Sequence, residues 1–281
     1  MFLLTKGIVT MTESNNKIAV VTGASSGLGK AISFELARKG VKVALMARRT
    51  EMLKENSARI VSEGGQALAL PVDVSDADAV RAAFEELDEH FHRIDYLFNA
   101  AGVLVPIKPL AKVDEVEFQS GIMVNVMGLV HVTKQALTRM LERGDGGTII
   151  NITSGAAYHA YSGWGLYSAS KAAMDMLTRC VALETNGTKV RITAIAPGIF
   201  ESHMQQTIRS TTEDDFPGKD KFVKMHEEGL VIPPEIPARM IVDTALSGWP
   251  ELNGMVVDVR SVEFQEGCRK HGIAIPAELT S

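Results

Sequence analysis

Tyr167 and Lys171 stand four positions apart in the stretch "GWGLYSASKAAMDML". If this stretch is helical, both side chains lie on one face. A phenol has a pKa near ~10, which makes it a poor proton carrier at neutral pH. The sequence predicts that the Lys171 ammonium lowers the pKa of Tyr167. The phenol would then donate a proton to a carbonyl oxygen during a reduction, and take it back in the reverse reaction.

Ser154 precedes this pair and offers a hydroxyl that could stabilise charge on the same oxygen. Taken alone, a tyrosine four residues before a lysine is more often a pair on the surface of a helix, so the surrounding elements must decide. The segment "YHAYSGWG" predicts that Tyr158, Tyr161 and Trp164 lie near or beneath a substrate cleft, where aromatic faces can stack on a flat molecule. His159, in the same segment, is expected to have a packing or surface role.

Short apolar runs alternate with helical patterns along the chain, which predicts a doubly wound parallel sheet of about seven strands with helices on both faces, a Rossmann-type α/β fold. We expect strands over 17–23, 41–47, 66–73, 95–102, 146–154, 189–198 and 254–260. We expect helices over 29–40, 50–65, 75–91, 114–143, 163–185 and 233–248.

The absence of a linker or repeat favours one domain over 17–262. Residues 1–16 read as an N-terminal extension, and Met11 is a possible start. The charged stretch 199–232 is expected to be irregular and to cover the substrate. Residues 263–281 are expected to form a C-terminal tail.

The 281 residues are 46% hydrophobic, which allows a sizeable core. The net charge is −5 and no Lys/Arg cluster occurs, so neither a nucleic-acid nor a membrane-surface partner is supported. Cys180 and Cys268 share no metal-ligand spacing, so no metal is expected and both read as free thiols of a reducing compartment. The start lacks a signal-peptide pattern, which favours the cytoplasm.

A glycine-rich loop, "TGASSGLG", joins the first expected strand to the first helix. Gly23, Gly27 and Gly29 allow a sharp turn, although glycines also simply end strands. The loop and the helix N-terminus can bind a pyrophosphate through backbone N–H groups. The whole loop is predicted to bind a nucleotide, through Gly23, Ser25, Ser26, Gly27, Leu28 and Gly29.

The end of the second strand, "LMARRTE", selects the nucleotide. A carboxylate there suits a free ribose 2′-hydroxyl, whereas an arginine suits a 2′-phosphate. Ala47 stands where the acid would be, and Arg48 and Arg49 follow. The sequence therefore favours NADP over NAD, the alternative being two solvated arginines before a helix.

Taken in order, these motifs resemble the short-chain dehydrogenase/reductase family over roughly residues 17–260. The resemblance rests on "TGASSGLG", Asp73–Val74, "NAAG" at 99–102, Asn125, Ser154, the Tyr167/Lys171 pair and "PG" at 197–198. Ala100 replaces a usual Asn, and Ser202 keeps the hydroxyl of a usual Thr.

The resemblance implies an oxidoreductase that forms a homodimer or homotetramer and acts on a small carbonyl or alcohol substrate. Lys171 would hold the nicotinamide ribose, and Asn125 would hold a water that links the lysine to solvent. The further cofactor-binding residues that it implies are Asp73, Val74, Asn99, Ala100, Gly102, Tyr167, Pro197, Gly198 and Ser202.

The catalytic region, with "VALE", "APG" and "MQQ" after it, is similar to that of sepiapterin reductases and bacterial benzil reductases. This resemblance implies reduction of a ketone or vicinal dicarbonyl. The acid that anchors a pterin has no match, because Asp258 lies within the expected last strand and Glu263 is offset. A 3-oxoacyl or sugar/polyol dehydrogenase and a catalytically silent nucleotide sensor remain alternatives.

Overall fold

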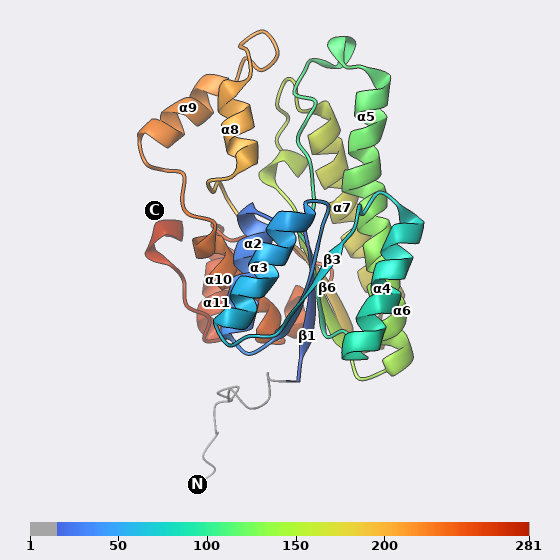
Figure 1. Cartoon of the computed structure of the whole chain (residues 1–281). Helices are drawn as coiled ribbons and strands as arrows, with labels where there is room; N and C mark the ends of the chain where they lie inside the picture. Colours follow the sequence, from blue (N-terminus) through green and yellow to red (C-terminus); the bar gives the residue numbers. More distant parts are fainter. Residues whose placement is uncertain (1–15, 281) are drawn as a thin grey trace.

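The computed structural model describes residues 16–280 of the chain, and the expectations about the start of the chain, including Met11, lie outside them. A parallel sheet of seven strands runs through the molecule in the order β3-β2-β1-β4-β5-β6-β7 (Figure 1). The strands are β1 Ile18–Thr22, β2 Lys42–Ala47, β3 Ala67–Pro71, β4 Tyr96–Asn99, β5 Gly147–Ile152, β6 Val190–Ala196 and β7 Val256–Asp258. This confirms the predicted doubly wound fold.

Helices cover both faces of the sheet (Figure 1). One face is packed by α2 Gly27–Arg38, α3 Thr50–Ser62, α10 Glu235–Leu246 and α11 Val262–Lys270. The other is packed by α4 Ala77–Phe91, α6 Gly128–Arg143 and α7 Gly165–Glu184. The remaining helical elements are α5 Glu115–Ile122, α8 His203–Ser210, α9 Lys219–Glu227 and the short 3₁₀ turns Leu110–Lys112, Gly155–Ala157, Pro250–Leu252 and Ala277–Leu279.

The central strand β1 shows why the strand sequences are almost continuously apolar. Successive side chains of a strand point to opposite faces of the sheet. Ala19 and Val21 pack in the cluster with α2 and α10, whereas Val20 packs in the cluster with α4 and α6. All three are fully buried, so both faces of this strand need apolar residues.

The predicted helix over 114–143 is continuous, but its middle is wound differently. Between α5 and α6 lies a π-helical segment, Met123–Met127, with Asn125 buried inside it. Such π-helical segments inside α-helices frequently mark functional positions. The backbone geometry therefore marks Asn125 as a candidate functional residue, independently of its residue type.

Two expectations about the C-terminal third are wrong. The stretch 199–232 is not irregular, because it contains α8 and α9. Residues 263–281 are not a tail: Phe264, Cys268 and Leu279 are buried in the core beside α10. Their apolar spacing on a short helix is a sequence signal that the prediction of a C-terminal tail did not take into account.

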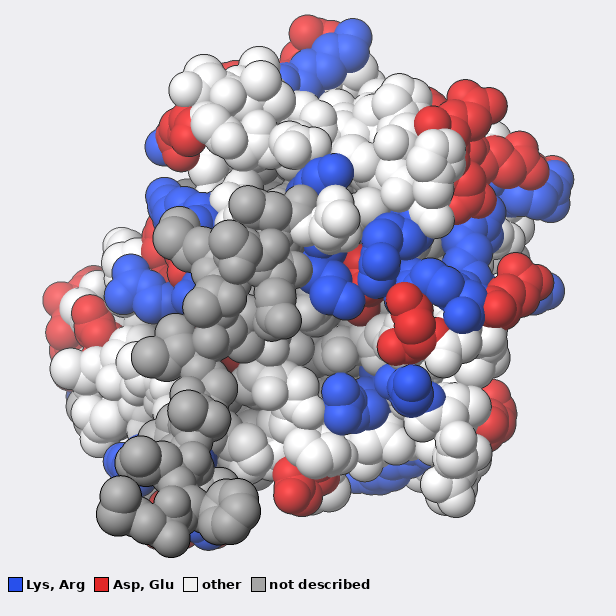
Figure 2. Space-filling view, turned by 90° about the horizontal axis from the view of Figure 1, so that it is seen from below, with Lys and Arg blue, Asp and Glu red and all other residues white. Residues whose placement is uncertain are grey.

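The amino ends of the strands carry a charged cluster. Asp95 is 5% exposed and forms ion pairs with Lys17, Arg93 and Arg143. Figure 2 looks onto this end and shows Lys and Arg side chains gathered there with Asp and Glu side chains among them. The cluster is thus internally paired. Within residues 16–280, no helix combines the length and apolar character needed to cross a membrane.

Candidate active site

A cavity of about 750 Å³ lies beyond the carboxyl ends of the strands. Residues that follow five different strands line it: Gly23 after β1, Arg48 after β2, Ala100 after β4, Ser154 after β5 and Gly198 after β6. Ligands of open α/β sheets bind at this edge, near the point where the strand order reverses. In this sheet the reversal lies between β1 and β4.

The structure brings all but three of the predicted site residues to this cavity. Those that line it are Gly23, Ser25, Ser26, Leu28, Gly29, Arg48, Arg49, Asp73, Val74, Ala100, Gly102, Ser154, Tyr167, Lys171, Pro197, Gly198 and Ser202. The residues selected from the sequence therefore come together in space from segments far apart in the chain.

Gly27, Asn99 and Asn125 do not line the cavity. The Asn99 amide is buried and donates to Thr133 Oγ1 at 3.0 Å and to Asn151 Oδ1 at 2.8 Å. These bonds hold β4 to β5 and α6, so both N–H groups of the Asn99 amide are used within the fold. Gly27 lies in the phosphate loop with a φ of 54°.

The glycine loop is built for close approach of a ligand to the backbone. Gly23 has a φ of 67°, which side-chain-bearing residues rarely adopt. A Cβ on Gly29 would lie 2.5 Å from the Gly23 carbonyl oxygen. Thr22 Oγ1 accepts hydrogen bonds from Ala100 N and Ala101 N, each at 3.0 Å, and so joins this loop to the loop after β4. These features fit a pyrophosphate cradle at the N-terminus of α2.

The two arginines after β2 take different positions. Arg49 Nη2 donates to Ser25 Oγ at 3.0 Å and also to Ser26 Oγ, so it lies over the phosphate loop. Arg48 Nη1 lies 3.7 Å from Asp73 Oδ2 and its side chain is 60% exposed. Both line the cavity beside the end of β2, and both carry a charge that a phosphate group could pair with.

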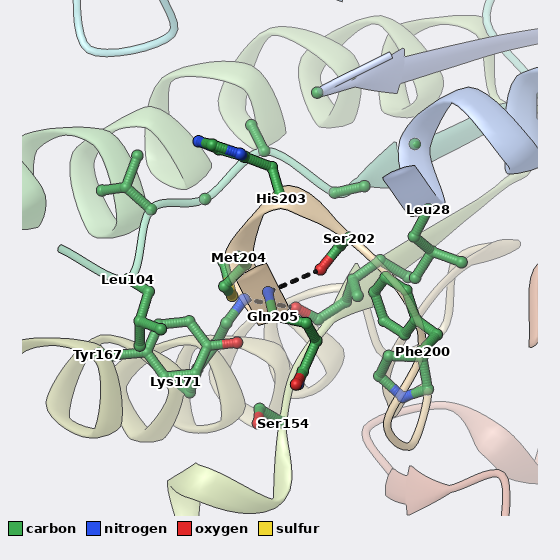
Figure 3. Close-up of a pocket in the computed structure, with 18 of the residues that line it drawn as sticks. Leu28, Leu104, Ser154, Tyr167, Lys171, Phe200, Ser202, His203, Met204 and Gln205 are labelled. Atoms are coloured by element: carbon green, nitrogen blue, oxygen red, sulfur yellow. Dashed lines mark hydrogen bonds between the residues drawn. The ribbon is translucent and has the colours of Figure 1, made fainter. Parts of the chain in front are cut away.

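Tyr167 and Lys171 come from the first two turns of α7 and point into the cavity beside Ser154 (Figure 3). The Lys171 Nζ atom lies 5.5 Å from the centroid of the Tyr167 ring and donates to the Ile152 carbonyl oxygen at 2.6 Å. The predicted sharing of one helix face is confirmed.

The expected lowering of the Tyr167 pKa is not found. Burial raises the pKa of Tyr167, and the nearby Ser154 hydroxyl offsets part of that rise. Burial also lowers the pKa of Lys171 to about 8, against which Asp175 acts. The reason is that both groups have lost their water, and desolvation outweighs the pairwise attraction expected from their spacing.

An aromatic cluster forms the wall beside the tyrosine. The Trp164 ring lies 5.9 Å from Tyr167 edge-on, 5.2 Å from Phe216 in a stacked arrangement and 5.3 Å from Phe222. Tyr161 completes it, 4.7 Å from Trp164. Since Phe216 and Phe222 belong to the covering stretch 199–232, these contacts hold that stretch against α7.

Tyr158 does not join this wall. Its side chain is 59% exposed and it lines a second cavity with Trp249 and Asp258. His159 lines both cavities, which is closer to the site than its expected packing or surface role.

The side chains of the main cavity that sequence reasoning missed include Met204, Gln205, Phe222 and Arg260. Arg260 lies two residues after the end of β7, and the rule that sites lie at the carboxyl ends of strands could have found it. Phe222 reaches the cavity only through the packing of α9, which no local pattern reveals.

The chain matches the family model described as short chain dehydrogenase over residues 17–213. It is 31% identical over 232 residues to a Bacillus cereus protein named benzil reductase ((S)-benzoin forming), an alignment that covers 80% of this chain and 92% of that protein.

Solved structures show the same fold. The KRED1-Pglu enzyme has a TM-score of 0.79 and 32% identity, and the alignment covers 86% of this chain and all of that one. A single-residue variant of the actinorhodin polyketide ketoreductase, with NADPH, also has a TM-score of 0.79, with 26% identity over 86% of this chain and 95% of that one.

Proposed function

The chain belongs to the short-chain dehydrogenase family, and on that basis we propose that it is an NADP-dependent reductase of small ketones or vicinal dicarbonyls. Its membership makes it an oxidoreductase. The proposal rests on one observation above others: Ser154, Tyr167 and Lys171 line the same cavity as an intact phosphate loop. A protein that only senses nucleotides has no need of this trio.

The preference for NADP is supported by charge at the mouth of the cavity. Ala47, Arg48 and Arg49 at the end of β2 carry no carboxylate, and the two guanidinium groups line the cavity, where they can bind a 2′-phosphate. The similar actinorhodin ketoreductase is described with NADPH. NAD is the weaker candidate, because it lacks the group that two arginines would bind.

The protein's own residues account for the proton that a carbonyl reduction needs. When bound, NADPH supplies the hydride for the carbonyl carbon. The Ser154 hydroxyl donates a hydrogen bond to the carbonyl oxygen, and Tyr167 transfers its phenolic proton to that oxygen. Burial raises the pKa of Tyr167, so the phenol is protonated at neutral pH but is a weaker acid than a free phenol, and the transfer depends on stabilisation of the phenolate that it leaves.

Lys171 assists the same proton transfer without contacting the substrate oxygen. Its positive charge, 5.5 Å from the ring centroid, stabilises the phenolate that proton transfer leaves on Tyr167. The family resemblance also assigns its Nζ to the nicotinamide ribose. Asn125 supports this end of the site by holding the loop after β4 through both ends of its amide.

The aromatic wall supports a flat, apolar substrate. Trp164, Tyr161 and Phe222 pack on one another and line the cavity beside Tyr167, where an aromatic substrate could contact them. The similar Bacillus cereus protein is named for benzil, an aromatic vicinal dicarbonyl. The apolar side chains of this wall also limit the access of water to the reacting atoms.

We also propose a homo-oligomer in the cytoplasm. Met176 and Leu183 on α7 and Val116 on α5 are between 55% and 79% exposed, and an interface between copies would bury them. A monomer in sedimentation at micromolar concentration would contradict this part of the proposal.

The test is a comparison of kcat/KM with NADPH for benzil and phenylpropanedione against sepiapterin, an acetoacetyl thioester and a simple sugar. The proposal expects the aromatic dicarbonyls to be turned over best. If the thioester or the sugar is best, the substrate class is wrong and only carbonyl reduction stands. If no carbonyl is reduced and no alcohol is oxidised, the nucleotide sensor replaces the enzyme.

A further inference from the structure

Gln205 lies in the first turn of α8, above the catalytic residues. Ser202 begins this helix, and its Oγ accepts from Gln205 N at 3.2 Å. On either side of Gln205, Met204 and Ile208 pack into the aromatic cluster around Trp164. The helix cap and this packing fix the register of α8, so the direction of the Gln205 side chain is set by the fold.

That side chain points into the cavity. Figure 3 shows Gln205 reaching from α8 toward the side of the cavity where Ser154 and Tyr167 lie. The next residue, Gln206, is exposed at the surface and does not line the cavity. The two adjacent glutamines of "MQQ" therefore have different surroundings, and only the first can meet a substrate.

The Gln205 amide is not used by the protein itself. Its Oε1 atom is buried and has no hydrogen-bond partner in the described part of the chain. A buried polar atom without a partner costs stability. A folded chain tolerates such an atom where a ligand completes its hydrogen bonding, and this one borders the cavity that must hold a polar substrate.

The reacting carbonyl oxygen already has two donors, the hydroxyls of Ser154 and Tyr167. A neighbouring second oxygen would face a wall that is otherwise largely apolar, made by Leu104, Met204 and Trp164. A primary amide offers two N–H donors and one acceptor, and rotation about its last bond exchanges them. With its amide flipped, Gln205 has Nε2 in the buried place of Oε1, and from there Nε2 can donate to a second carbonyl oxygen.

We propose that Gln205 is a specificity-determining residue that donates a hydrogen bond to the second oxygen of a vicinal dicarbonyl. This inference rests on the proposed carbonyl reduction and narrows it. The second oxygen is unchanged by the reaction, so Gln205 holds substrate and hydroxyketone product alike. It selects dicarbonyls over simple ketones without taking part in proton transfer.

The experiment compares kcat/KM with NADPH for phenylpropanedione and for its two single ketones, propiophenone and phenylacetone. Gln205→Leu keeps the size of the side chain and removes the amide. The dione should lose about ten- to a hundredfold, the range for one buried hydrogen bond, whereas both single ketones stay within about threefold. Gln206→Leu is the matched control and should leave all three values unchanged.

An equal loss for the dione and the single ketones would overturn the inference, because it would show a structural role. A kcat/KM for the dione that is unchanged in Gln205→Leu would overturn it as well. If that variant does not fold, Gln205→Asn keeps the amide but shortens its reach, and should lower the dione-to-ketone ratio by a smaller factor. Failure of the proposed function looks different: the unmodified protein then reduces none of these compounds, and both proposals fall.

Discussion

Asn125 is hydrogen-bonded at both ends of its amide to one residue, Val103. Its Oδ1 accepts from Val103 N at 2.8 Å and its Nδ2 donates to Val103 O at 2.7 Å. Val103 belongs to the loop after β4, and Asn125 to the π-helical segment of the long helix. The pair therefore holds the floor of the cavity to the helix that packs behind it.

Asn125→Asp should destabilise the fold, because a carboxylate cannot donate to the Val103 carbonyl and would repel it. We expect the free energy of unfolding to fall by about 1–3 kcal/mol in urea denaturation, the cost of a broken buried hydrogen bond. The exposed Asn186→Asp is the control, and equal effects of the two substitutions would show that the bonds to Val103 contribute little.

The lowered pKa of Lys171 predicts how activity depends on pH. Since Lys171 loses its proton as the pH rises through about 8, its charge is present below that value and absent above it. We expect kcat/KM for NADPH, measured at saturating dicarbonyl, to fall about tenfold per pH unit above pH 8, because this parameter reports groups of the free enzyme.

Lys171→Arg provides the control for that profile, since a guanidinium stays charged over the whole range. Its remaining activity, though lower, should show no fall between pH 7 and about 10. A fall of the same shape in this variant would assign the titration to another group.

Cofactor choice should depend on the two arginines after β2. We expect the unmodified protein to prefer NADPH to NADH in kcat/KM. Arg48→Asp should narrow or reverse the preference through repulsion of the 2′-phosphate. Arg49→Leu should lower kcat/KM for NADPH by about 10- to 150-fold, the range for a hydrogen bond to a charged group. The value for NADH should change little.

The exposed Lys54→Gln, on α3 but away from the cavity, should change neither cofactor and controls for general loss of positive charge. Equal kcat/KM for the two cofactors in the unmodified protein would contradict the assignment to NADP.

The phosphate loop should be far less tolerant of an added methyl group than the start of α7. Gly29→Ala would press a Cβ against the Gly23 carbonyl group, whereas nothing lies within 4 Å of a Cβ on Gly165. We expect Gly29→Ala to lower the free energy of unfolding by about 1–3 kcal/mol and to abolish NADPH binding in a fluorescence titration. Gly165→Ala should leave both stability and NADPH binding unchanged. If Gly29→Ala also leaves them unchanged, the close contact with Gly23 does not restrict this position.

The parts of the site that depend on local spacing were predictable from sequence. Tyr167 and Lys171 share a helix face because they are four residues apart, and the glycine loop follows a recognisable strand. The orientation of Asn99 was not predictable, because it depends on its bonds to Thr133 and Asn151, which are distant in sequence.

Neighbouring residues of one loop can also be separated by long-range packing. Tyr161 lies in the aromatic wall while Tyr158 faces a second cavity, although both precede the same helix. The difference depends on where Phe216 and Phe222 pack, and those positions are set by the fold of the covering stretch. The local sequence pattern does not predict such contacts between residues that are distant in the chain.

The central claim is that Tyr167 supplies the proton in an NADPH-dependent carbonyl reduction. Its most direct test is kcat for phenylpropanedione with NADPH in the unmodified protein and in Tyr167→Phe, alongside NADPH affinity by fluorescence. Because the ring remains and only the hydroxyl is lost, we predict a fall in kcat of about 10²–10⁴-fold with affinity nearly unchanged. A variant that keeps most of its turnover would contradict the account.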